Sequence, residues 1–146
     1  MNERESEILK NFSNDIREDL SFALKFISES AVTVIVELNG SITTYNAAYF
    51  QEKMNSLVDY GYTTLVFTMS RTKYVSAIGI GSFVHISERV KQYGGYIVLE
   101  QMQPQVLEVF QLPGFDHYFT VDETISSVRT GIGLKKYNGS REFRRF

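Results

Sequence analysis

The segment TLVFTMSRTKYVSAIGIGSF, residues 64–83, decides the fold of this chain. It begins as an apolar run with β-branched residues, passes through the polar loop SRTKYVSA, and reaches Gly79 and Gly81 where a helical pattern starts. A strand that leads through a loop into a helix is the repeating unit of a parallel sheet, and ligands or partners gather at such loops. The free N–H groups of the first helical turn favour an anion there. The alternative is an ordinary connection whose glycines serve close packing.

The flanking sequence predicts strands and helices in alternation. Residues 20–27 alternate apolar and polar side chains and residues 32–38 are β-branched, so they predict two strands joined as a hairpin. The other expected strands are 63–69, 96–100 and 117–121. Five helices are expected: 4–18; 45–61, closed by Gly61; one that begins at residue 78 or 79 and ends at the glycine pair 94–95; 104–112, opened by Pro104; and 122–129, with Asp122 as N-cap. This order predicts an α/β sandwich, with a mixed sheet of about five strands, the later ones parallel, and helices packed against it.

The composition predicts one ordinary globular domain. The chain has 146 residues, of which 43% are apolar, and its formal net charge of -2 gives no sign of wholesale nucleic-acid binding. It contains no cysteine, which excludes disulfides and thiolate metal sites. The N-terminus lacks the apolar core of a secretory signal, and no apolar run approaches the roughly 20 residues that span a membrane. We therefore expect a cytoplasmic protein.

The two ends of the chain differ in charge. Residues 1–19 carry six acids and three bases, whereas residues 129–146 carry six bases and one acid. The first end holds the expected helix 4–18, whose apolar stripe of Ile8, Phe12 and Ile16 must be covered. That helix packs on its own domain, mediates self-association or docks a partner. The basic end, which contains three glycines, is expected to be a mobile tail that contacts an acidic partner, a membrane surface, nucleic acid or only solvent.

No catalytic constellation is visible in the sequence. The two histidines, His85 and His117, have no nucleophile paired with them, and Asp116 beside His117 lacks a third metal ligand. Gly79 and Gly81 are not followed by Lys-Ser or Lys-Thr, so they do not form a nucleotide P-loop. We therefore expect a protein that is not an enzyme and that uses no cofactor or metal.

Several segments together resemble the STAS domain of bacterial anti-sigma factor antagonists. Two segments are the most specific. In the first, a strand leads through YVSAIGIG into a helix. In the second, the glycine pair is followed by a strand, by PQVLEVF and then by LPGFD. The resemblance covers about residues 20–128 and implies a STAS-like sandwich over that range. Residues 1–19 are then an N-terminal helical extension and residues 129–146 a basic C-terminal tail.

The resemblance implies a function as a binding module in partner switching. Such an antagonist binds an anti-sigma factor of kinase fold and releases the sigma factor, until a serine at the start of this helix is phosphorylated. The family pattern is an apolar residue, Asp or Ser, the phosphoacceptor, a small residue and Gly. In this chain the acceptor position is Ala77, which cannot be phosphorylated, with Ser76 before it and Gly79 closing the pattern. Ser76 stands one residue too early to replace the acceptor, although it is the first alternative, and Thr72 and Ser70 of the same loop are the next ones.

Two family acids are also replaced by neutral hydroxyl residues. They fall at Thr43 and Thr68, which we expect on one surface with Ser76. The predicted partner-binding residues are Thr43, Ser70, Arg71, Thr72, Lys73, Ser76, Ala77, Gly79 and Gly81. Loss of the acceptor predicts constitutive binding to an anti-sigma factor. It also suits a STAS subunit that docks on a transporter ATPase, or a scaffold in a stress-sensing complex, which the extra N-terminal helix favours. A homo-oligomer through that helix is a further expectation.

Overall fold

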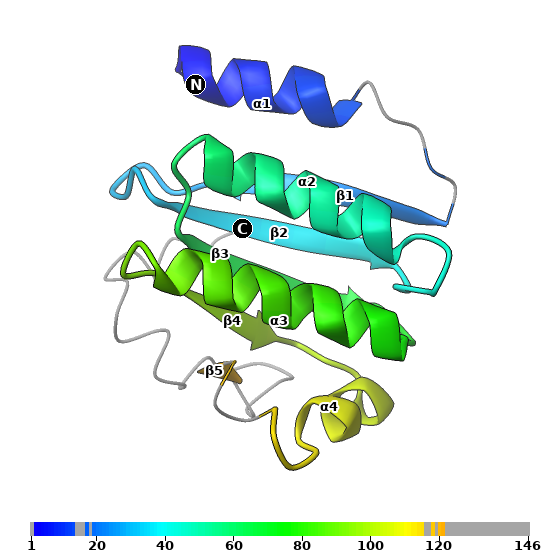
Figure 1. The fold of residues 1–146 in the computed structure, drawn as a ribbon. Helices are drawn as coiled ribbons and strands as arrows, with labels where there is room; N and C mark the ends of the chain where they lie inside the picture. The colour runs from blue at the N-terminus through cyan, green and yellow to red at the C-terminus, as the bar shows by residue number, and fades with distance from the viewer. Residues whose placement is uncertain (1, 14–16, 18, 116–117, 119, 122–146) are drawn as a thin grey trace.

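The fold is a mixed sheet with helices on one side (Figure 1). The computed structural model describes residues 2–13, 17, 19–115, 118 and 120–121. In chain order the elements are α1 (Glu3–Ser13), β1 (Leu20–Phe26), β2 (Thr33–Gly40), α2 (Ala47–Asp59), β3 (Thr64–Arg71), α3 (Ala77–Lys91), β4 (Tyr96–Glu100), α4 (Pro104–Phe110) and β5 (Thr120–Val121). The predicted α/β class is confirmed, although the fifth strand contains only two residues.

The strands lie in the sheet in the order in which they occur in the chain, β1-β2-β3-β4-β5. β1 and β2 form the predicted antiparallel hairpin, with Phe22 opposite Leu38, and each later strand runs parallel to the one before it. Because parallel neighbours are joined by right-handed crossovers, successive helices fall on the same side of the sheet. Figure 1 shows α2 and α3 side by side across that side. The loops that leave β2 and β3 are therefore brought together at one edge.

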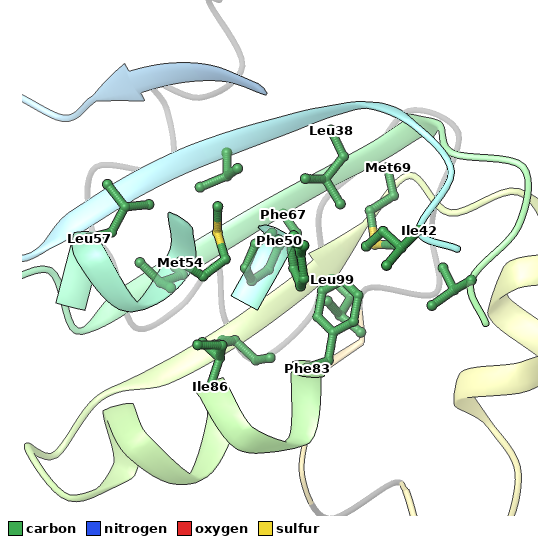
Figure 2. Close-up of a cluster of buried hydrophobic side chains, with 14 of the residues drawn as sticks. Leu38, Ile42, Phe50, Met54, Leu57, Phe67, Met69, Phe83, Ile86 and Leu99 are labelled. Carbon is green, nitrogen blue, oxygen red and sulfur yellow. The ribbon is translucent and has the colours of Figure 1, made fainter. Parts of the chain in front are cut away.

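The main core lies between the sheet and these helices. Alternate residues of β3, including Phe67, point into it, and they meet Phe50 of α2 and Phe83 of α3 (Figure 2). The ring centroids of Phe50 and Phe83 are 4.8 Å apart, and those of Phe67 and Phe83 are 5.2 Å apart in an edge-to-face arrangement. Phe110 of α4 extends the cluster at 5.2 Å from Phe83. Burial of these rings holds α2, α3 and α4 against the sheet.

Helix α1 packs on its own domain, which was one of three alternatives. Ile8 is fully buried in the main core. Arg4 donates to the carbonyl oxygen of Ala31 at 2.8 Å, and its guanidinium lies 4.3 Å from the centre of the Tyr62 ring. Lys53 of α2 donates to the carbonyl oxygen of Asn11 at 3.2 Å. These contacts cover the predicted apolar stripe, apart from Ile16, which lies outside the described residues.

Some predicted boundaries were wrong. The structure gives α1 as Glu3–Ser13 and places Arg17 outside any helix, whereas the predicted helix ran to residue 18. β3 continues to Arg71 because a bulge lets Arg71 pair with Asn39 of β2. The predicted strand at 117–121 contains β5, although residues 117 and 119 lie outside the described residues. Outside them too are Asp116, His117, the predicted helix at 122–129 and the tail at 129–146. The division at residues 19 and 128 stays a prediction.

Candidate functional site

The candidate site is formed where the loop after β2 meets the loop after β3. Ile42 and Val75 form a parallel bridge between the two loops. The N–H of Ile42 donates to the carbonyl oxygen of Tyr74 at 3.0 Å, and the N–H of Ser76 donates to that of Ile42 at 2.8 Å. The bridge places both loops beside the first turn of α3.

Ser76 is the N-cap of α3. It has an extended backbone, with φ -72° and ψ 166°, and its hydroxyl accepts a hydrogen bond from the N–H of Gly79 at 3.0 Å. Such a bond satisfies one of the free N–H groups at a helix start, which explains why α3 begins at Ala77, before the predicted Ile78 or Gly79. Ser76 is only 3% exposed. Ala77, the residue predicted to stand at the acceptor position, is exposed and carries only a methyl group.

The two glycines of α3 have different roles. A Cβ atom on Gly79 would lie 2.8 Å from Cγ2 of Ile42 and 3.0 Å from Cγ1 of Val75, so Gly79 permits the close approach of helix and loops. A Cβ atom on Gly81 would have nothing within 4 Å. The packing interpretation of the glycines is therefore right for Gly79, and no contact in the structure explains Gly81.

Thr43 orders the loop that leads into α2. Its hydroxyl accepts hydrogen bonds from the N–H groups of Tyr45 and Asn46, at 3.2 and 3.3 Å. The buried Asn46 side chain accepts from the N–H of Thr43 at 2.8 Å and donates to the Asp19 carboxylate at 2.9 Å. The bonds from Asn46 and Arg17 hold the pKa of the Asp19 carboxyl below its ordinary value of 3.8. Thr43 is thus a structural turn residue within the predicted surface.

The predicted residues Ser70 to Lys73 lie along the end of β3 and the loop after it. Thr72 is fully buried and donates to the carbonyl oxygen of Gly40 at 2.9 Å, so its hydroxyl is withdrawn from the surface. Ser70, Arg71 and Lys73 are exposed. Among the described residues, neither Arg71 nor Lys73 forms an ion pair. The two cations therefore present their charge to solvent at the surface of the site.

Thr68 does not join this surface, contrary to our expectation. It alternates along β3 with Phe67 and Met69, which point into the main core, so it lies on the other face of the sheet. Its hydroxyl donates to Glu100 of β4 at 3.3 Å. The prediction failed because the sequence located Thr68 at the end of the strand but did not show which face of the sheet its side chain occupies.

Three exposed apolar side chains near Ala77 were missed from the sequence. Tyr45 is 91% exposed, Tyr74 is 56% exposed and Ile78 is 55% exposed. Tyr45 follows Thr43 in one loop, Tyr74 lies in the other, and Ile78 is the second residue of α3. Large apolar residues inside polar loops were the available signal, because such residues are usually buried.

A groove lies beside the candidate site, and its lining includes the carboxylates of Glu52 and Asp59. It lies between α2 and α3, with Ile78 and Ser82 on one wall and Gln51, Asn55 and Asp59 on the other. Within the described part of the chain, no three potential metal-ligating His, Asp or Glu side chains gather. Nor does that part contain a helix with the length and apolarity to cross a bilayer.

The family model and the most similar known proteins point to the same family. The family model described as STAS domain matches residues 8–128. BtrV of Bordetella bronchiseptica, which is named as an anti-sigma factor antagonist, is 30% identical over 88 residues, which are 60% of this chain and 76% of BtrV. The anti-sigma-B factor antagonist of Bacillus subtilis is 26% identical over 88 residues, which are 60% of this chain and 80% of that protein.

Among solved structures, the fold is similar to that of SpoIIAA, an anti-sigma factor antagonist of Bacillus known in unphosphorylated and phosphorylated forms. The unphosphorylated form has a TM-score of 0.59 at 20% identity, over 69% of this chain and 87% of SpoIIAA. At this identity the similarity shows the fold alone.

Proposed function

The chain belongs to the STAS domain family, and from that premise we propose that it is a non-enzymatic anti-sigma factor antagonist that binds an anti-sigma factor of kinase fold without a serine phosphoswitch. The observation that carries the proposal is Ala77. It is exposed at the first position of α3, directly after the N-cap, where the family pattern requires a hydroxyl. An alanine has no oxygen to phosphorylate, so a kinase partner cannot release itself by modifying this position.

Ser76 does not replace the missing acceptor. Its hydroxyl holds the N–H of Gly79, and its side chain is buried beneath the Ile42–Val75 bridge. A kinase would have to break the N-cap and open the first turn of α3 to reach it. A phosphate there would add roughly -2 of charge in a buried position. Thr72 is excluded by the same argument, because its hydroxyl is buried against Gly40.

The proposed binding surface comprises the exposed members of the predicted set. These are Ser70, Arg71, Lys73, Ala77 and Gly81. The other predicted residues hold the two loops and the start of α3 in place through the hydrogen bonds and contacts described above. They are Thr43, Thr72, Ser76 and Gly79. The protein acts in the cytoplasm, where sigma factors work, and its control comes from its abundance or from its partner.

Affinity capture from host lysate, with mass spectrometry of the retained proteins, tests the proposal. We expect the tagged full chain to retain an anti-sigma factor of kinase fold, equally with and without added Mg-ATP. A variant with Tyr45 and Ile78 both changed to Asp should retain less of the anti-sigma factor, because charge then occupies the exposed apolar part of the site. Release by ATP, with phosphate on this chain, would overturn the absence of a switch.

The same capture distinguishes the other roles. Retention of a transporter ATPase or of a large stress-sensing assembly, and no anti-sigma factor, would overturn the antagonist role. The extra N-terminal helix no longer favours a scaffold, because Ile8 and Phe12, the described residues of its apolar stripe, are packed on this domain. No specific observation therefore favours the transporter subunit or the scaffold over the antagonist.

A further inference from the structure

The surface around Ala77 has an uneven charge. The sequence contains no acidic residue from 38 to 51 or from 60 to 87, which are the segments that form the two loops and most of α3. Arg71 and Lys73, in contrast, are exposed and pair with no described acid. The positive end of the α3 macrodipole lies at Ala77. Arg71, Lys73 and the start of α3 therefore bring positive charge to this surface, in a chain whose formal net charge is -2. The acids beside it are Asp19, which is paired with Arg17, and Glu52, which lines the groove next to Ile78.

Apolar area accompanies this charge. Of the six exposed large apolar side chains among the described residues, three are Tyr45, Tyr74 and Ile78. Tyr74 lies next to Lys73, and its carbonyl oxygen accepts from Ile42 of the loop that carries Tyr45. Tyrosines and arginines are enriched at the centres of protein interfaces because they give large contact area with specific polar atoms.

The loop that carries Arg71, Lys73 and Tyr74 is held from both sides. On one side, Thr72 donates to Gly40, and the Ile42–Val75 bridge follows. On the other side, the side-chain amides of Gln103 and Gln105 donate to the carbonyl oxygens of Ser70 at 2.9 Å and Lys73 at 3.3 Å. Because the loop is already ordered, little backbone entropy remains to be lost when a partner binds.

We infer that this surface recognises an acidic segment of a protein partner, whose carboxylates face Arg71 and Lys73 while an apolar side chain packs on Tyr45 and Ile78. The inference deepens the proposed function and rests on it, since it describes the matching face of the anti-sigma factor. A protein fits better than a nucleic acid. Two cations can neutralise only two phosphates, and tight nucleic-acid binding uses several such contacts.

Calorimetric titration with the purified anti-sigma factor from the capture, at 50 and 300 mM NaCl, tests the inference. We expect the wild-type Kd to rise at least about tenfold with salt, since exposed charges are screened over shorter distances at higher ionic strength. The double variant Arg71→Glu/Lys73→Glu should bind at least about tenfold more weakly at 50 mM, and its Kd should no longer rise with salt, because salt now screens a repulsion. Tyr45→Ala should weaken binding by a similar factor at both salt concentrations.

A matched control is Lys10→Glu/Lys91→Glu, which changes the charge equally on α1 and at the far end of α3. Lys91 is fourteen residues from Ala77, or about 21 Å along the helix axis. This control should bind as the wild type does, and circular dichroism should show that both double variants are folded.

Three results would overturn the inference. The first is that Arg71→Glu/Lys73→Glu binds the anti-sigma factor as tightly as wild type does, and in that case the proposed function still stands. The second is that the Lys10→Glu/Lys91→Glu control loses as much affinity as Arg71→Glu/Lys73→Glu does. The third is that wild type binds a 20-base-pair DNA duplex and that the Arg71 and Lys73 changes abolish this binding. If the captured partner is not an anti-sigma factor but the titration behaves as expected with it, the surface stands and the proposed function falls. Retention of no protein overturns both.

Discussion

Two adjacent residues, Ser76 and Ala77, perform separate tasks at the start of α3. Ser76 is buried and caps the helix, whereas Ala77 is exposed at the predicted acceptor position. A hydroxyl at one position is structural, and a hydroxyl at the next would be open to modification. The sequence placed Ser76 one residue before the predicted acceptor, but only the structure shows that its hydroxyl caps the helix.

The capping role of Ser76 predicts a loss of stability on its removal. Ser76→Ala should lower the free energy of unfolding by about 0.5–2 kcal/mol, because the N–H of Gly79 loses its acceptor. Ser76→Asp keeps an acceptor for that N–H and should recover part of the loss. Urea unfolding followed by circular dichroism measures both variants. Equal losses in Ala and Asp variants would show that packing, not capping, matters at this position.

The two glycines of α3 give a matched pair of substitutions. Gly79→Ala should destabilise the protein by about 1–3 kcal/mol, because its Cβ atom would overlap the buried Ile42 side chain. Gly81→Ala has open space and should stabilise it by about 0.5–1 kcal/mol through helix propensity. The same urea experiment measures the difference. A stabilising Gly79→Ala would contradict the close approach of loop and helix.

At the scale of elements, periodicity predicted most of the fold because each strand and helix has a distinct apolar pattern. The hairpin, the strand at 96–100 and the helix opened by Pro104 appear where the pattern placed them. Long-range pairing decided what the pattern left open. Arg71 joins β3 only because Asn39 of β2 pairs with it, and Thr68 faces the far side of the sheet because of the register of β3. Neither contact has a local signature.

The placement of α1 predicts a stability effect without a change of oligomeric state. Ile8→Ala should lower the free energy of unfolding by about 2–5 kcal/mol, because it leaves a cavity in the main core. Lys10→Ala, on the exposed side of the same helix, should have little effect. Urea unfolding and size-exclusion chromatography of both variants provide the measurement. An unchanged stability with altered elution would instead assign Ile8 to self-association.

At the scale of the whole molecule, Asp19 connects the segment before β1 to the loop before α2, so its ionisation affects how these parts are joined. Its folded pKa lies below the ordinary value of 3.8, so the unfolded chain binds the proton first as pH falls. The stabilisation is therefore complete above that value and is lost as pH falls through the folded pKa. The unfolding free energies of wild type and Asp19→Asn should differ at pH 7 and converge toward pH 3.

Urea titrations at the two pH values measure this convergence. Arg17→Gln removes a secondary contact of the carboxylate and should give a smaller pH-dependent loss than Asp19→Asn does. A difference between wild type and Asp19→Asn that is as large at pH 3 as at pH 7 would show that the Asn46 contact stabilises the fold by its geometry alone.

The proposed function makes the regulation of the whole molecule depend on one missing oxygen, and it predicts that restoring that oxygen restores the switch. Ala77→Ser places a hydroxyl at an exposed position of α3 while Ser76 remains the cap. With Mg-ATP and the captured anti-sigma factor, we expect this variant to gain one phosphate by mass spectrometry and then to release its partner. The phosphate adds roughly -2 of charge where carboxylates of the partner are inferred to lie. Wild type, and Gly81→Ser one helical turn further along, should remain unmodified and bound. Phosphorylation of wild type, or of Gly81→Ser to the same extent, would contradict the assignment of Ala77 as the position that decides whether this protein can be switched.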